Sequence, residues 1–156
     1  KRDLWESLKT EAKKQIRKEL DAKIVVNDQS LEAIRASKKN AEWAGVVDLL
    51  EFHPGDFRKI PIPEPPGVVI LNPEYGERLG EVKQLTDVYS AIGDFFKSQC
   101  AGYRGYIFTG NPDLIKHIGL RTSSKLPFFN GKLECRLLEY ELYKGTKKKS
   151  GLDPIK

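Results

Sequence analysis

The feature that most constrains the fold is an alternation of short β-branched runs with longer stretches of helical spacing. Apolar runs predict strands at residues 23–28, 47–52, 67–71 and 103–109. Apolar residues three and four apart predict helices at residues 4–20, 30–43 and 82–98. Strands that are apolar almost throughout are typical of parallel sheets covered on both faces. The alternation therefore predicts an α/β doubly wound sheet.

The last third of the chain indicates a change of strand direction. Asn130-Gly131 lies between two β-rich runs, residues 125–129 and 133–143. An Asn-Gly pair between such runs is the strongest short-range signal for a β-hairpin. We expect the sheet to close with an antiparallel hairpin.

Local signals give the expected ends and inner faces of the helices. Asp3 begins a candidate capping box for the first helix, and Ser30 is a candidate N-cap for the second, which Gly45 would terminate. Trp5 and Trp43 are expected in the core, because each follows an apolar helix face.

Composition fits one globular domain without a membrane segment. The chain has 156 residues, 39% hydrophobic and 31% charged, and it holds no apolar run near the ~20 residues that cross a bilayer. The net charge of +5 comes from the first helix and from a basic tail, residues 144–156, whereas the middle is slightly acidic. Such ends are more often solvated than RNA-binding.

Cysteine and histidine usage argues against a metal or disulfide framework. Cys100 and Cys135 are far apart and lack the spacing of zinc ligands, so we expect them to be packing residues of a cytoplasmic protein. His53 and His117 are isolated, and surface or capping roles are favoured for them.

In doubly wound sheets, ligands bind beyond the carboxyl ends of the strands, where this chain has two acidic residues. Asp28 ends the first strand and is able to accept hydrogen bonds from both hydroxyls of a ribose; the alternative is a helix-capping aspartate. Asp56 is able to accept from an adenine amine while Phe57 packs beside it; the alternative is an ordinary turn.

Asn72-Pro73-Glu74-Tyr75 follows the third strand and suits methylation of a base amine. The Asn72 side-chain oxygen and the Pro73 carbonyl are two neighbouring acceptors that can hold both N–H groups of an amine. Tyr75 offers a ring on which an extruded base can stack. A bare pattern of this kind is more often a type I turn.

Four blocks in order resemble the catalytic domain of THUMP-containing RNA guanine-N2 methyltransferases, the bacterial large-subunit ribosomal RNA type. They lie at residues 72–80, 109–113, 118–121 and 129–138, and the likeness runs from Leu4 to about Tyr143. The resemblance implies a Rossmann-like class I methyltransferase sheet that uses S-adenosylmethionine. By position it implies a ribose-binding Asp28, an adenine-binding Asp56 and an amine-binding set of Asn72, Pro73 and Tyr75.

The chain departs from that family in two ways. Glu74 stands where the family has a second proline. The first strand and its glycine-rich loop, which hold the methionine end of the cofactor, are expected before residue 1, as is the RNA-binding THUMP region. Residues 1–143 are therefore expected to be part of a methyltransferase domain that is inactive by itself and binds the cofactor weakly.

Three functions remain in competition. The first is guanine-N2 methylation of ribosomal RNA, which the 76–80 and 129–131 blocks favour by resemblance only. The second is adenine-N6 methylation of a nucleic acid, since the same acceptor pair suits either amine. The third is a non-catalytic RNA-binding module that keeps the fold.

Overall fold

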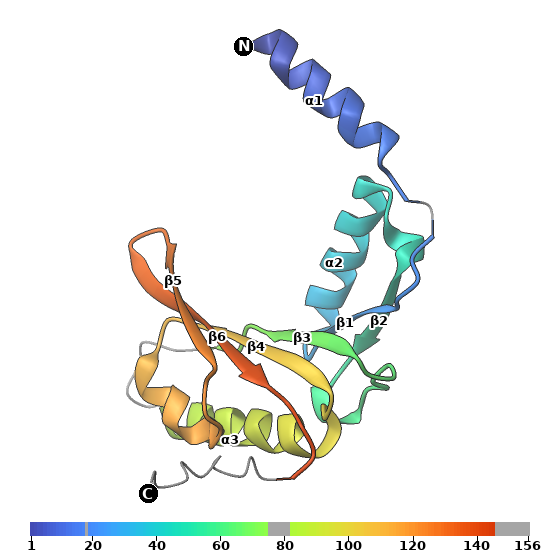
Figure 1. Cartoon of the computed structure of the whole chain (residues 1–156). Coiled ribbons are helices and arrows are strands. Elements are labelled where there is room, and N and C mark those ends of the chain that lie inside the picture. The colour runs from blue at the N-terminus through green and yellow to red at the C-terminus, as the bar shows by residue number, and fades with distance from the viewer. Residues whose placement is uncertain (18, 75–81, 146–156) are drawn as a thin grey trace, which may run out of the picture. The chain divides into compact units, whose positions relative to one another are not determined.

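We analyse a computed structural model that describes residues 1–17, 19–74 and 82–145, with no side-chain description for 82–84. The chain divides into two compact units, Lys1–Pro61 and Ile62–Lys156. They are unit 1 and unit 2 below, and both are drawn in Figure 1.

Unit 1 is built around two parallel strands and one helix. Strand β1 (Ile24–Asp28) pairs with β2 (Leu50–Pro54), with Ile24 opposite Leu50 and Asp28 opposite Pro54. Helix α2 (Leu31–Ala44) lies between them in sequence and buries Ile34 and Ala41. The caps are as the sequence predicted: the Ser30 hydroxyl accepts from the Ala33 N–H, and Gly45 ends the helix at φ 71°.

Helix α1 (Arg2–Lys14) differs from its prediction in three respects. It ends before residue 20, in a tight last turn where the Gln15 N–H donates to the Ala12 carbonyl and the Ile16 N–H to the Lys13 carbonyl. Asp3 lies inside the first turn, so the capping box is wrong. None of its described side chains is buried, and Trp5 is 61% exposed, so its assignment to the core is wrong as well.

Two further predictions for unit 1 are wrong. Trp43 is 76% exposed, because it follows the buried Ala41 by two positions, which is a rotation of about 200° to the opposite side of the helix. The second strand begins at Leu50, since residues 47–49 form a 3₁₀ turn, η1 (Val47–Leu49).

Unit 2 is a four-stranded mixed sheet with a long helix on one face. Its strand order is β3-β4-β6-β5, with bounds β3 (Gly67–Leu71), β4 (Tyr103–Thr109), β5 (Ser124–Asn130) and β6 (Leu133–Glu141). β3 and β4 are parallel, and β6 is antiparallel to both of its neighbours. Helix α3 (Val82–Gln99) and the 3₁₀ helix η3 (Pro112–Ile118) pack together below the sheet in Figure 1.

The core of unit 2 lies between α3 and the sheet. The large side chains that are almost fully buried include Tyr89, Ile92, Phe96, Ile107 and Tyr140. Gly93 allows η3 to approach α3, since a Cβ there would overlap the carbonyl oxygen of Ile118. Burial raises the pKa of the Cys100 thiol to about 12. Cys100 and Cys135 are both buried free thiols, which confirms them as packing residues.

The predicted hairpin is confirmed, with its turn displaced by one residue. Asn130 pairs with Leu133, so the central residues are Gly131 and Lys132. Gly131 has φ 62°, and no other type of residue has positive φ among those described. This pattern matches a turn with glycine at its first central position. Lys132 consequently lies at the end of the hairpin.

Candidate functional site

The carboxyl ends of β1 and β2 are joined by one amide side chain. Asn27 Nδ2 donates to the carbonyl oxygens of His53 at 2.7 Å and of Gly55 at 2.9 Å. The Gly55 N–H in turn donates to the carbonyl of Asp28 at 2.9 Å. Asn27 therefore fixes the segment from which Asp56 projects. The sequence signal for this role is an amide near the end of an otherwise apolar strand.

Asp28 is exposed, and its carboxylate accepts one hydrogen bond from the segment that leads into α2. Its Oδ1 accepts from the Ser30 N–H at 2.7 Å, in a turn that precedes α2, while the N-cap of that helix is Ser30 itself. Its Oδ2 accepts no hydrogen bond from the described residues. A carboxylate has about four lone-pair positions, so the bond from the Ser30 N–H leaves Asp28 able to accept from hydroxyl groups as well.

Asp56 caps the short 3₁₀ helix η2 (Phe57–Lys59) and is engaged by Arg58. Oδ1 accepts from the Arg58 backbone N–H and from Nε, both at 2.9 Å, while Oδ2 accepts from Nη2 at 2.6 Å. The guanidinium, followed by the backbone N–H, lowers the Asp56 pKa from 3.8 to about 2. Asp56 is thus an ionised acceptor at physiological pH, and a base amine would share it with Arg58.

Phe57 stands between these two residues in sequence and is half-buried. The guanidinium carbon of Arg58 lies 5.9 Å from its ring centroid. Arg58 therefore orders both the carboxylate and the ring, a role that our sequence reading did not assign. The signal was local, because an arginine two residues after an aspartate can reach back to it.

In unit 2, Asn72 and Pro73 directly follow β3. Asn72 is exposed, and its amide makes no hydrogen bond with another described residue. Pro73 is half-buried and Glu74 is exposed. Tyr75, the predicted stacking residue, lies outside the described residues.

A buried polar pair supports the adjoining end of β4. Leu71 lies opposite Ile107 in the register, so β3 and β4 end at the same edge. Thr109 is 2% exposed, and its hydroxyl lies 2.6 Å from the Tyr89 hydroxyl. Thr109 Oγ1 also accepts from the Asn111 N–H at 3.1 Å. These bonds fix the loop beside the Asn72 edge.

The hydrogen-bond acceptors Asp28 and Asp56 suit an organic ligand with hydroxyl and amine groups. The described residues include no group of three side chains that could hold a metal ion. Asp28 and Asp56 are acceptors for hydroxyl and amine N–H groups, which are the groups that the ribose and adenine of S-adenosylmethionine present. The residues present therefore fit the adenosine part of that cofactor.

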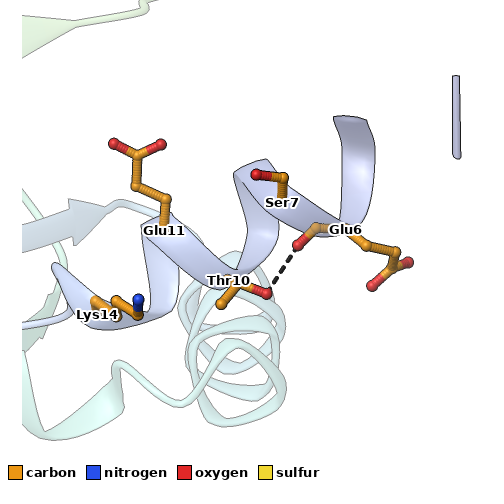
Figure 2. Close-up of a pocket in the computed structure, with 5 residues that line it drawn as sticks. All are labelled: Glu6, Ser7, Thr10, Glu11 and Lys14. Atoms are coloured by element: carbon orange, nitrogen blue, oxygen red, sulfur yellow. Dashed lines mark hydrogen bonds between the residues drawn. The ribbon is translucent and has the colours of Figure 1, made fainter. Parts of the chain in front are cut away.

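Two hollows lined by described residues of unit 1 contain none of the predicted site residues. One lies along α1, where Glu6, Ser7, Thr10, Glu11 and Lys14 line it (Figure 2). All five side chains come from one helix, so they cannot enclose a ligand. Thr10 donates to the Glu6 carbonyl at 2.8 Å. A second lies around residues 19–24 and 48–51. No described helix has both the length and the apolar character of a membrane span.

The chain is similar to known methyltransferases in sequence and in fold. The Ribosomal RNA large subunit methyltransferase K/L of Chromohalobacter salexigens is 39% identical over 142 residues, which are 87% of this chain and 19% of that protein. The crystal structure of a possible methylase from Clostridium difficile 630 is 28% identical, with a TM-score of 0.78, over 97% of this chain and 39% of that one.

A second structure, that of SMU.472 complexed with SAH, is 24% identical with a TM-score of 0.77, and the likeness covers 96% of this chain and 38% of that one. It supports the fold. The chain thus spans about a fifth to two-fifths of the length of these proteins. The predicted Rossmann-like α/β fold is confirmed. Residues 1–139 match the RMKL-like methyltransferase domain, and the chain belongs to that family.

Proposed function

We propose that the polypeptide carrying this chain transfers a methyl group from S-adenosylmethionine to the exocyclic N2 amine of a guanine in ribosomal RNA, in the cytoplasm. The observation that carries the proposal is the Asn72-Pro73 pair directly after β3, with an exposed amide that no other described residue engages. The ribosomal RNA methyltransferase K/L relatives support RNA as the substrate.

Asn72 and Pro73 would act by orienting the amine. Its lone pair is delocalised into the base, so it must be turned towards the methyl group before it can react. The Asn72 oxygen and the Pro73 carbonyl would each accept one N–H. Positioning of this kind supplies a large part of many rate enhancements. Once alkylated, the nitrogen is acidic and releases its proton without a dedicated base.

Asp28 and Asp56 would hold the adenosine part of the cofactor, with Phe57 beside the adenine. S-adenosylmethionine supplies an electrophilic methyl group on a sulfonium. Asp28 would accept from the ribose hydroxyls through Oδ2, since Ser30 occupies Oδ1. Asp56 would accept from the adenine amine in a direction that Arg58 leaves open.

The test is single-turnover methyl transfer to ribosomal RNA by the whole polypeptide, with the modified nucleoside identified by mass spectrometry. Asn72→Ala is expected to slow transfer by roughly 100-fold or more, because the amine loses its orientation. Cofactor affinity, measured by calorimetry, should stay within a few-fold. Asn40→Ala removes an exposed amide on α2 and serves as the matched control.

The modified nucleoside separates the three functions. N2-methylguanosine supports the proposal, and N6-methyladenosine supports the adenine alternative. RNA binding without transfer supports the non-catalytic module. Glu74→Pro adds a further comparison, because it introduces the second proline that the THUMP-containing methyltransferases have at this position. Methyl transfer is expected to be equal or faster.

A further inference from the structure

The β5–β6 hairpin extends past the edge at which Asn72 lies. The last β4 residue in the register, Thr109, pairs with Arg136, while the hairpin continues to the Asn130–Leu133 pair. Three further residues at about 3.3 Å each carry the turn roughly 10 Å beyond β4. In Figure 1 the hairpin projects from the rest of the sheet. Its end therefore lies beyond the same edge as the proposed amine site.

Two adjacent phenylalanines of β5 have different surroundings. Phe128 contacts Phe108 of β4 edge-on, with ring centroids 6.0 Å apart. Phe129 points to the other face of the strand and is 73% exposed. It has no ring contact with another described residue. An aromatic ring this exposed is free to stack with a ligand.

Positive charge surrounds Phe129. Residues 121–136 contain the cations Arg121, Lys125, Lys132 and Arg136, against one carboxylate, Glu134. All five side chains are exposed. The register places Lys125 and Arg136 on the same face as Phe129, and Lys132 lies in the turn. Lys132 and Arg136 lie at or beyond the end of β4, whereas Lys125, opposite Leu138, is level with Ile107 of β4. Arg136 also pairs with Glu134 at 3.3 Å.

We propose that this hairpin surface, made of Phe129, Lys125, Lys132 and Arg136, binds single-stranded RNA that flanks the target nucleotide. A base would stack on Phe129, and the lysines and Arg136 would contact phosphates. Exposed aromatic rings among cations are the standard way in which proteins hold single strands without reading their sequence. This inference rests on the proposed function, because it names where the substrate of that same site continues.

The location of the surface favours RNA over another protein. A base presented to Asn72 must leave its stack, and the nucleotides on either side are then available for other contacts. The end of β5 lies roughly 10 Å beyond that edge and three strands, about 14 Å, to the side of β3, which is within reach of the next few nucleotides. The excess of cations complements a phosphate chain, whereas the core of a protein interface is typically depleted of charge.

The experiment measures the affinity of the whole polypeptide for a fluorescein-labelled single-stranded RNA of 15 nucleotides. Phe129→Ala is expected to raise the dissociation constant by about 5- to 100-fold, since one stacked base is lost. Phe129→Tyr should bind like the unmodified protein. Tyr143→Ala is the matched control: it removes another exposed ring, just after β6 at the opposite end of the strand, and should change affinity less than twofold.

Salt dependence tests the cations separately. Lys132→Ala should make the plot of log affinity against log salt concentration shallower by about 0.7, the expectation for one phosphate contact on a single strand. Lys97→Ala, which removes an exposed lysine from the last turn of α3, should leave the slope unchanged. Glu134→Gln should tighten binding, because it removes the carboxylate opposite Phe129.

Three results would overturn the inference. Unchanged affinity in Phe129→Ala removes the stacking platform. Equal losses in Phe129→Ala and Tyr143→Ala show a non-specific effect. A change in oligomeric state on sedimentation of Phe129→Ala, without a change in RNA affinity, assigns the surface to contacts between copies. If Phe129→Ala binds RNA normally while Asn72→Ala still abolishes transfer, the hairpin surface fails and the proposed function stands.

Discussion

The two units of the chain are stabilised in different ways. Among the described residues, the buried apolar side chains of unit 1 are Ile34 and Ala41, and all others lie in unit 2. Unit 2 packs a long helix on a four-stranded sheet, whereas unit 1 has one helix on two strands and a second helix, α1, with no buried side chain.

This difference bears directly on the candidate site. In unit 2, the edge that carries Asn72 rests on packed aromatic and aliphatic side chains. In unit 1, the edge that carries Asp28 and Asp56 is fixed by polar bonds from Asn27, Ser30 and Arg58. Apolar burial contributes about 25 cal/mol per Å², while a single hydrogen bond contributes about 1 kcal/mol net. We therefore expect unit 2 to tolerate the loss of polar groups better than unit 1.

The largest expected effect is on the core of unit 2. Phe96→Ala should lower the free energy of unfolding by about 3–5 kcal/mol, because it leaves a cavity under the sheet. Trp43→Ala removes a larger ring from unit 1, yet it should change stability by less than about 0.5 kcal/mol, since that ring is exposed. Urea unfolding followed by circular dichroism measures both. Similar losses in the two variants would contradict the comparison.

The second-largest expected effect concerns the contact between α3 and η3 in unit 2. Gly93→Ala places a Cβ against the Ile118 carbonyl oxygen, so α3 and η3 must separate. A loss of about 1–3 kcal/mol is expected, although alanine favours helix in itself. Asp94→Ala, at the exposed neighbouring position, should be neutral or stabilising. A stabilised Gly93→Ala variant would show that the two helices do not depend on this approach.

The polar edge of unit 1 gives a third comparison. Asn27→Ala removes two hydrogen bonds and leaves the His53 and Gly55 carbonyls without that donor. We expect a loss of about 1–3 kcal/mol, together with faster hydrogen exchange at the Gly55 amide. Gln29→Ala, which removes an exposed amide two residues later, is the control. Unchanged exchange at Gly55 would mean that the strand ends are held by other contacts.

The smallest effect concerns the titration of Asp56. Its depressed pKa means that the carboxylate's contribution to stability is present above about pH 4 and is lost as the pH falls through about 2. Arg58→Ala should raise the Asp56 pKa only part of the way to 3.8, because the backbone N–H at position 58 still donates to the carboxylate. Carbon-detected NMR titration of the Asp56 carboxyl measures the change. A pKa that stays near 2 would assign the shift to another neighbour.

Much of the fold could be predicted because its signals are local. Ser30 and Gly45 bound α2 through contacts within one turn of the chain, and glycine at position 131 supplies the positive φ of the hairpin turn. Strands 67–71 and 103–109 are as the apolar runs indicated. For the candidate site, the sequence predicts polar residues directly after the strands, and within each unit the parallel pair of strands ends at a shared edge.

The sequence by itself thus determined most of the helices, strands and turns, though not the end of α1 or the start of β2, since hydrophobic period, caps and turn residues act over a few positions. Only the tertiary structure decided which apolar faces are covered: Trp5 follows the same kind of stripe as Tyr89, yet the first is exposed and the second is buried. It also decided how Asn27 joins two strand ends that are 26 residues apart in sequence. Burial and long-range hydrogen bonds depend on which partner an element meets, and the local pattern of residues does not specify that partner.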